Sequence, residues 1–141
     1  MFAQVTLGAF TSGLDAGQIY QTWPSMNNKF LPDDYDFSNI ILSEMFFDAS
    51  LVQFLHRNMA YLIVIYFFLL LIYFLINKKK HLYKYLSFVS VMILIQILLG
   101  IFTLTSGLNI VLASLHQIST TILLISSMIL SFEASKKIVS N

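Results

Sequence analysis

The chain contains no cysteine, a single arginine and few charged residues of any kind. Without cysteine it can form no disulfide, offer no thiolate to a metal and use no cysteine nucleophile. Charged residues occupy only 11% of the 141 positions and hydrophobic residues occupy 57%. Soluble domains average about 25% charged residues, so this composition excludes a soluble globular domain and indicates a protein of the lipid bilayer. The net charge of +1 gives no sign of nucleic-acid binding.

The signatures of several enzyme classes are also missing. The sequence has no glycine-rich dinucleotide motif, no phosphate-binding loop and no zinc motif. No hydroxyl side chain at membrane depth has the base and orienting acid that a Ser–His–Asp triad requires. The opening residues lack a basic segment followed by an apolar core and a cleavage site, so we expect no signal peptide. We identify no low-complexity segment and no repeat within the chain.

Long apolar stretches dominate the sequence. Three of them reach the roughly 20 residues that a membrane-spanning helix needs, namely residues 50–77, 85–104 and 108–133. The stretch at residues 1–14 would extend only about 20 Å as a helix, less than a hydrocarbon core of roughly 30 Å. It is either an interfacial or re-entrant piece or, as we prefer, the end of a fourth helix. The predicted fold is an all-α integral membrane protein with three complete transmembrane helices and the end of a fourth, forming a four-helix half-bundle.

Charged residues are distributed asymmetrically around these spans. The loop at residues 15–49 carries six acidic residues and one lysine. Lysines instead lie between the first two spans and after the third: Lys78, Lys79, Lys80, Lys84, Lys136 and Lys137. Loops rich in lysine and arginine stay on the cytoplasmic or matrix side of a membrane. We therefore expect the acidic loop 15–49 to lie outside and the C-terminus inside.

Two histidines lie within the first and third predicted spans. An ionisable side chain in hydrocarbon is costly and is by default a candidate functional residue. His56 lies 22 residues before Lys78, and His116 lies 20 residues before Lys136. Both should therefore lie about 30 Å from the inner boundary, near the outer face. Imidazole is a common ligand of haem iron, and helical bundles hold cofactors between facing helices. The two histidines thus predict a haem whose iron they bind axially.

Three further residues are candidates for contacts to this haem. Arg57 could pair with a haem propionate, or it could reach lipid phosphate at the membrane boundary. Gln117 could support its neighbour His116. Gly100 lies near the predicted depth of the iron, on a stripe of small and polar residues in the second span. That stripe comprises Gln96, Gly100, Thr103 and Gly107. The third span has a similar stripe, which comprises Ala113, His116, Thr120, Ser127 and Ser131. Taken alone, the stripes favour helix–helix packing through small residues over a haem wall, and the two histidines at the same level shift that balance.

In combination, three stretches of the chain resemble haem A synthase, the membrane enzyme family that makes haem A for terminal oxidases. The stretches are Gly8-Ala9-Phe10 through Gly13-Leu14-Asp15-Ala16-Gly17 to Tyr20 and Thr22-Trp23-Pro24; Val52-Gln53-Phe54-Leu55-His56-Arg57 to Ala60-Tyr61; and Gln96 to Gly100, then Leu112-Ala113 to His116-Gln117. The resemblance implies a fold of eight spans in two four-helix halves. Residues 1–141 resemble the second, C-terminal half.

The resemblance also implies a cofactor and a division of labour. In the half that this chain resembles, haem b is held between two histidines that correspond to His56 and His116. The other half oxidises the methyl group of haem O to a formyl group and has a glutamate three residues before its His-Arg pair. Here that position is Gln53, which cannot ionise or relay a proton as a carboxylate could. The cysteine pair in the outer loops of some members is also absent. We therefore expect the electron-transfer haem in this chain, and no catalytic residue of the oxidation.

The function predicted from the sequence is that of an oxidoreductase: the haem b-binding half of a haem A synthase, inactive without the N-terminal half. Two alternatives stay open, a stand-alone bis-histidine membrane cytochrome for electron transfer and a non-catalytic fragment in which the histidines merely pack. Expected partners are the N-terminal half or a second copy of the chain, membrane lipid, and haem O as the substrate of the complete enzyme. Haem O synthase and cytochrome oxidase assembly factors are further candidates. The expected location is the bacterial inner membrane or the mitochondrial inner membrane.

Overall fold

The computed structural model describes residues 1–34 and 45–136. Most of them belong to four α-helices: α1 (Phe2–Gly13), α2 (Ala49–Ile76), α3 (Tyr83–Thr105) and α4 (Ile110–Lys136). Two short 3-10 turns, η1 (Ala16–Gln18) and η2 (Lys80–Leu82), follow α1 and precede α3. No strand occurs in the described ranges, which confirms the predicted all-helical class. Residues 35–44 of the acidic loop and 137–141, including Lys137, lie outside the described residues.

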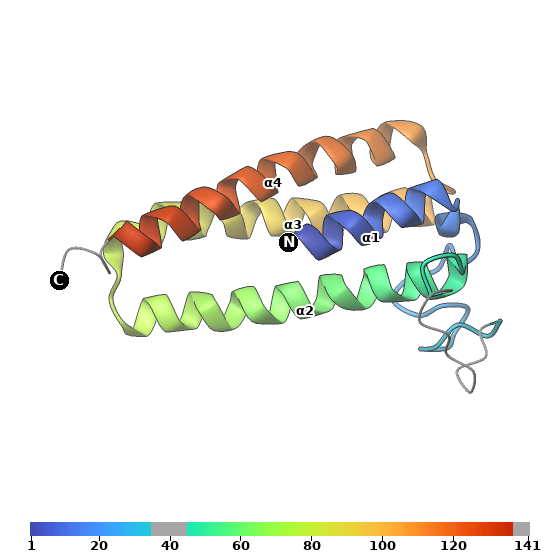
Figure 1. The fold of residues 1–141 in the computed structure, drawn as a ribbon, viewed down its shortest axis with the longest axis horizontal. Coiled ribbons are helices and arrows are strands. Elements are labelled where there is room, and N and C mark those ends of the chain that lie inside the picture. Colours follow the sequence, from blue (N-terminus) through green and yellow to red (C-terminus); the bar gives the residue numbers. More distant parts are fainter. Residues whose placement is uncertain (35–44, 137–141) are drawn as a thin grey trace.

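Three of the helices in the described ranges are long and apolar enough to cross a membrane. They are α2, the segment Lys80–Thr105 that contains α3, and α4. In Figure 1 these helices run side by side along the long axis of the molecule. The shorter α1 begins near the middle of the bundle and runs antiparallel to α2, alongside the end where the acidic loop lies. The fold is therefore that of a helical membrane protein.

The ends of the long helices follow from local sequence. Asp48 accepts a hydrogen bond from the Leu51 backbone N–H at 2.7 Å and so caps α2. The helix α4 begins at Ile110, two residues later than expected. The reason is the tight turn before it, where Gly107 and Leu108 both have positive φ angles, 72° and 63°. Such angles reverse the chain and cannot continue a right-handed helix.

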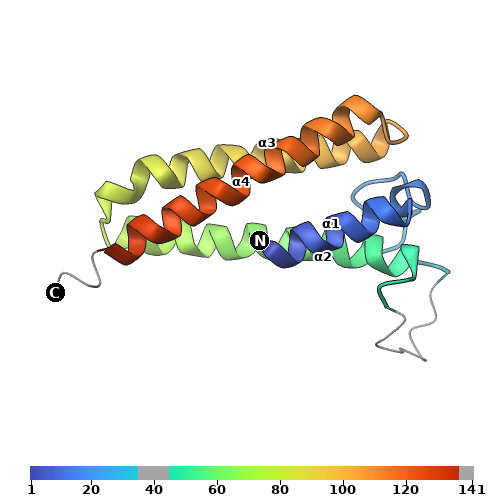
Figure 2. The same cartoon turned by 45° about the horizontal axis from the view of Figure 1, so that its top comes forward.

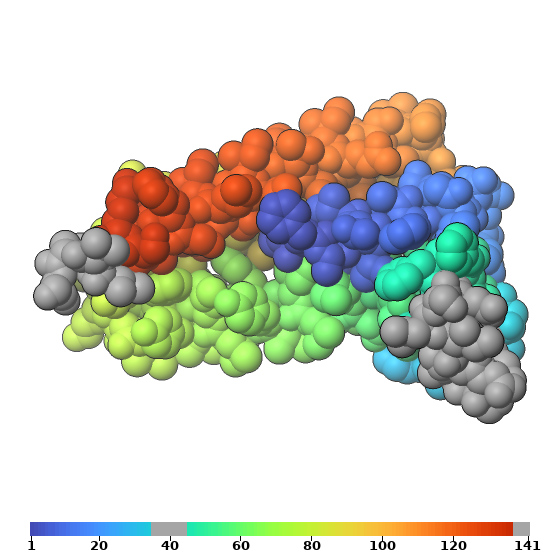
Figure 3. Space-filling model, viewed as in Figure 1, coloured from blue at the N-terminus to red at the C-terminus, as the bar shows by residue number. Residues whose placement is uncertain are grey.

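The four helices form two pairs. The closest backbone packing is between α1 and α2 and between α3 and α4. Figure 2 shows α1 directly beside α2, and α3 beside α4. In the space-filling view, α1 lies between α4 and α2 on the face toward the viewer (Figure 3). The pairs also meet near the outer loop, where a Cβ on Gly17 would come within 2.7 Å of Leu108 Cδ2. Glycine at this position thus lets η1 pack against the α3–α4 turn.

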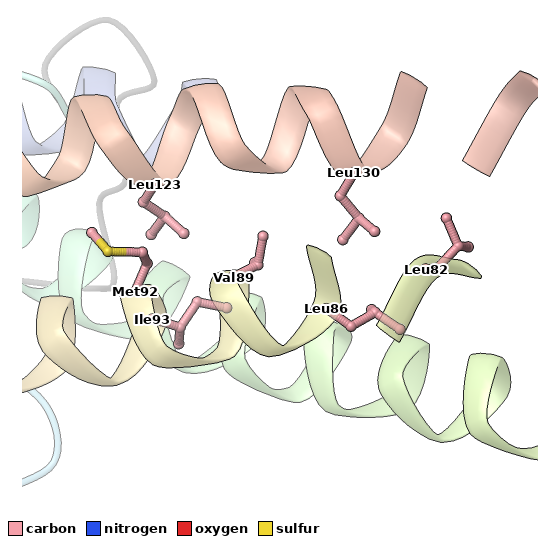
Figure 4. Close-up of a cluster of buried hydrophobic side chains, with 7 residues drawn as sticks. All are labelled: Leu82, Leu86, Val89, Met92, Ile93, Leu123 and Leu130. Carbon is pink, nitrogen blue, oxygen red and sulfur yellow. The ribbon is translucent and has the colours of Figure 1, made fainter. Parts of the chain in front are cut away.

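The apolar core lies toward the ends of the helices that are far from the loop at residues 15–49. It comprises Leu82, Leu86, Val89, Met92, Ile93, Leu123 and Leu130, which interdigitate between α3 and α4 (Figure 4). Partly buried side chains of α2 pack against it: Val64, Phe67, Leu70, Leu71 and Phe74. Among the described residues, no buried hydrophobic side chain lies between residues 53 and 81 or between 94 and 122. The apolar core therefore stops short of the part of the bundle that contains both membrane histidines.

Candidate functional site

The first membrane histidine, His56, is held against α1 by one turn of that helix. A Cβ on Gly8 would lie 3.2 Å from His56 Cε1, so the absence of a side chain at position 8 lets the ring lie close to the α1 backbone. The Gln4 amide nitrogen donates to the His56 carbonyl oxygen at 3.1 Å and lies 3.2 Å from the ring Nδ1. Gln4 and Gly8 are four residues apart and therefore share one face of the helix. This face fixes both the backbone and the ring of His56.

The second membrane histidine, His116, is held in the same manner against α3. A Cβ on Gly100 would lie 3.2 Å from His116 Cε1. The Gln96 amide nitrogen donates to the His116 carbonyl oxygen at 3.2 Å and to the Ser119 hydroxyl. The Thr120 hydroxyl donates to the same carbonyl at 2.7 Å. The polar stripes of α3 and α4 therefore pack against each other, as the helix-packing interpretation expects, with Gly100 in contact with the His116 ring.

The two histidines occupy equivalent places along their helices. Ile76 and Lys136, the last residues of α2 and α4, each lie 20 residues after the histidine, which is about 30 Å of helix. Within the described residues no three His, Cys, Asp or Glu side chains are grouped to hold a bare metal ion. The available donor set is therefore two imidazoles from different helices.

This donor set fits a flat metal cofactor better than a free ion. Haem iron needs only axial ligands from the protein, because the porphyrin supplies the others. The His116 Nδ1 atom is buried and has no hydrogen-bond partner, and buried polar atoms without a partner are uncommon and call for an explanation such as a missing ligand. The cluster of buried hydrophobic side chains between α3 and α4 includes no residue of α2 and lies away from both histidines. These observations are compatible with haem and do not identify it.

Arg57 makes contacts that the sequence did not predict. Its guanidinium donates to the backbone carbonyls of Tyr20 at 2.7 Å and Thr22 at 2.9 Å. It therefore ties the outer loop to the beginning of α2. The Nε atom of Arg57 is buried and has no partner, so one donor remains for a propionate, and that contact stays a prediction. Gln117 is exposed on α4, and its supporting role also stays a prediction.

A polar network beneath the outer loop was missed by the sequence analysis. The Tyr20 hydroxyl donates to Asp34, and the Ser50 hydroxyl donates to the other oxygen of the same carboxylate. The Gln53 amide donates to the Tyr20 carbonyl at 3.0 Å. Gln53 therefore anchors the loop to α2. It occupies the position at which, by the resemblance, the substrate half has a glutamate. No local pattern reports these contacts, because the partners are 14 to 33 residues apart.

The network shifts the pKa values of its two ionisable groups in opposite directions. Burial raises the pKa of Tyr20, and its hydrogen bond to Asp34 acts the same way. Burial also acts to raise the pKa of Asp34, but the hydrogen bonds from Ser50 and Tyr20 outweigh it and hold the pKa below the usual value. Tyr20 is therefore kept neutral and Asp34 ionised around neutral pH.

Gln4 was also missed, although the sequence contains a signal for it. The spacing of Gln4 and Gly8 on α1 is that of Gln96 and Gly100 on α3. The second pair belongs to a stripe that the sequence analysis singled out, whereas the first lies in a stretch too short to span a membrane. The structure brings each pair to one histidine.

The fold is that of a multi-span helical membrane protein in which two histidines each pack against a glycine of a neighbouring helix. The sequence model of the cytochrome oxidase assembly protein family (COX15-CtaA) matches residues 1–128. The chain belongs to this family. The resemblance noted from its motifs is thereby confirmed.

The chain is also similar to several proteins named Heme A synthase. It is 45% identical over 132 residues to that of Pelagibacter ubique (strain HTCC1062), covering 94% of this chain and 39% of the relative. It is 37% identical over 124 residues to that of Rickettsia bellii (strain OSU 85-389), covering 88% and 37%. It is 33% identical over 124 residues to that of Rickettsia africae (strain ESF-5), covering 88% of this chain and 36% of the relative. The chain thus spans less than two fifths of the length of each of these relatives. No solved structure matches it.

Proposed function

We propose that this chain is the haem b-binding half of a haem A synthase. The observation that carries the proposal is the pair of membrane histidines, His56 and His116, each held by a glutamine and a glycine of the neighbouring helix. Membership of the cytochrome oxidase assembly protein family and similarity to proteins named Heme A synthase support the biosynthetic assignment. The chain covers only 39% of the Pelagibacter relative, so the activity of a whole synthase belongs to the proposal.

In this proposal His56 and His116 would hold the haem by its iron. A bound haem would supply one-electron transfer. Gly8 and Gly100 let the two rings lie against α1 and α3 without a clash. Arg57 and the outer loop cover the site on the side of the acidic residues, because the guanidinium holds the loop on the start of α2.

The oxidation itself is assigned to a half that this chain does not contain. Gln53 has no ionisable group, and its amide is engaged with the Tyr20 carbonyl, so it cannot serve as an acid or base. We therefore propose that the chain works with an N-terminal half that binds haem O and oxidises its methyl group to formyl. The lysine-rich ends of α2 and α4 are proposed to face the cytoplasm or matrix, with the acidic loop outside, in a bacterial or mitochondrial inner membrane.

The ligand assignment is tested by the absorption spectrum of the chain purified from membranes in detergent. We expect a low-spin b-type spectrum after reduction, lost in both His56→Ala and His116→Ala. His81→Ala is the matched control, because His81 is an exposed histidine in η2 and its replacement should leave the spectrum unchanged. A spectrum that survives either of the first two substitutions would overturn the assignment.

The biosynthetic role is tested by co-expressing the chain with the N-terminal half of a related synthase in a host that supplies haem O. Haem A in the extracted pigments is the expected result. Bound haem b without any haem A would instead favour a stand-alone electron-transfer cytochrome. A chain that binds no haem even with added haemin would favour a structural fragment.

A further inference from the structure

Two short segments far apart in the chain are nearly the same sequence. Residues 4–11 and 96–103 are identical at five of eight positions, which hold glutamine, leucine, glycine, phenylalanine and threonine in the same order. The tripeptide Ser-Gly-Leu follows the first segment directly, at residues 12–14, and follows the second after two further residues, at residues 106–108. The first segment forms α1 and the second forms the outer half of α3. Each is followed by a helix that contains a Leu-His pair, Leu55-His56 in α2 and Leu115-His116 in α4.

The glutamines and glycines of the two segments make the same contacts. Gln4 donates to the His56 carbonyl at 3.1 Å, and Gln96 donates to the His116 carbonyl at 3.2 Å. A Cβ on either glycine, Gly8 or Gly100, would lie 3.2 Å from Cε1 and 3.7 Å from Nδ1 of its histidine. Two unrelated helix contacts would not be expected to share the residue types, their spacing and these distances together.

The threonines repeat a third feature. The Thr11 hydroxyl donates to the Leu7 carbonyl at 2.8 Å, and the Thr103 hydroxyl donates to the Leu99 carbonyl at 2.7 Å. These bonds lie one turn beyond the glycines in both helices. Agreement therefore extends from the sequence to local hydrogen bonding and to the contacts between helices.

We infer that α1–α2 and α3–α4 are two copies of one helix-pair repeat, and that Gln4 with Gly8 and Gln96 with Gly100 are positioning residues that orient the two histidines. The identity of the ligand between the histidines rests on the proposed function. The inference corrects the sequence analysis, which identified no repeat. The repeat is obscured because the glycine and histidine are 48 residues apart in the first copy and 16 in the second. The difference is the long outer loop of the first copy.

The physical basis of positioning is the close contact between each imidazole and the neighbouring helix. A methyl group at Gly8 or Gly100 would be 3.2 Å from the ring, closer than carbon atoms normally pack, so the ring would have to move. The glutamine bond ties the backbone of the histidine to the neighbouring helix at the same level. Groups that hold a metal ligand in place commonly change metal affinity about 10- to 100-fold when they are replaced.

The inference is tested first without haem, by NMR of the full chain with 15N-labelled histidine rings in detergent. Gly8→Ala and Gln4→Met should move the ring signals of His56, whereas Gly100→Ala and Gln96→Met should move those of His116. Gly13→Ala is the matched control, because a Cβ there would meet nothing within 4 Å. Shifts no larger than those of the control, or equal shifts of both histidines in every variant, would overturn the inference.

The second measurement is haem affinity and the low-spin signal of the haem-loaded chain in electron paramagnetic resonance. All four variants should bind haem about tenfold more weakly or worse and shift the low-spin signal, whereas Gly13→Ala should not. A wild-type chain that binds no haem, with the selective ring shifts present, would reject the proposed function and leave the positioning role standing. Tight haem binding with unchanged signals in all four variants would reject the positioning role and leave the proposed function standing.

Discussion

The two helix pairs hold their histidines alike but are connected differently. In α3–α4 the connection is a tight turn through Gly107 and Leu108, and the pair shares the apolar core with the inner part of α2. In α1–α2 the connection is the long outer loop, which is bound to α2 by Arg57 and Gln53. The comparison teaches that the histidine contacts do not depend on how the helices are joined. The start of the long loop contacts both pairs, because Gly17 lies against Leu108 and Tyr20 accepts from Arg57.

The pairs also differ at the ring nitrogens. Gln4 reaches the Nδ1 atom of His56 at 3.2 Å. Gln96 instead donates to Ser119, and the Nδ1 atom of His116 is buried without a partner. The two imidazoles therefore have unequal hydrogen bonding, although their backbones are held in the same way. Hydrogen bonds around a metal ligand tune it, so the two histidines should not be equivalent ligands.

Filling the two glycine contacts should give the largest effects. Gly8→Leu and Gly100→Leu each place a large side chain where even a Cβ would be 3.2 Å from a histidine ring, and overpacking typically costs about 1–3 kcal/mol. We expect both to abolish haem binding. Gly100→Leu should also lower the melting temperature more, because α3 is anchored in the apolar core whereas the short α1 can shift.

Haem titration and thermal unfolding measure these two effects. Gly13→Leu serves as the control, since a Cβ at that position has open space around it. Equal haem binding in Gly100→Leu and Gly13→Leu would show that the contact with His116 does not govern the site.

Removing the Arg57 side chain should affect one pair and spare the other. Arg57→Met removes the donors to the Tyr20 and Thr22 carbonyls, and hydrogen bonds to charged groups contribute about 1.5–3 kcal/mol each. Amide hydrogen exchange should rise in residues 16–34 and remain unchanged in the α3–α4 turn. Lys84→Met, which removes an exposed cation on α3, is the control. Unchanged exchange in the loop would mean that Arg57 does not hold it.

The caps of the two histidine-bearing helices allow a direct comparison of smaller effects. Asp48 accepts from the Leu51 N–H, and Asn109 accepts from the N–H groups of Val111 and Leu112. Asp48→Ala and Asn109→Ala should each lower the free energy of unfolding by about 1 kcal/mol. Chemical denaturation of each variant checks this value. A markedly larger loss for Asp48→Ala would mean that the outer loop depends on the α2 cap.

The smallest effect expected is a pH dependence confined to the outer loop. The pKa of Asp34 is lower in the folded chain than in the unfolded chain, where it is about 3.9. Ionised Asp34 therefore contributes to stability above the unfolded pKa, and this contribution is lost as the pH falls through the pKa of the folded chain. The raised pKa of Tyr20 has its effect at high pH. Neutral Tyr20 contributes to the stability of the folded loop below about pH 10, and this contribution is lost as the pH rises through the pKa of Tyr20 in the folded chain. The loop should therefore loosen only in acid and in strong alkali.

Trp23, the only tryptophan, lies in this loop and reports the change by its fluorescence. Asp34→Asn should remove the acid transition and leave the alkaline one. An acid transition of the same size in Asp34→Asn would assign it to another group.

Local patterns predicted the parts of the structure that depend on local physics. Apolar runs located the three spans, and counting back from the lysines gave the relative positions of the two histidines along their helices. The predicted start of α4 was two residues early because Leu108 is apolar and was counted with the apolar run that follows it. In the structure Leu108 has a positive φ angle and belongs to the turn before the helix. The roles of Gln4 and Gln53 could not be read locally, since their partners lie 52 and 33 residues away.

The central claim is that His56 and His116 together bind one haem. Electron paramagnetic resonance of the oxidised, haem-loaded chain tests it most directly, because two imidazole ligands give low-spin ferric iron and the loss of one gives a high-spin signal. The account predicts a low-spin signal in the wild-type chain and in His81→Ala, and conversion to high spin in both His56→Ala and His116→Ala. A low-spin signal that persists unchanged in either of the last two variants would contradict it.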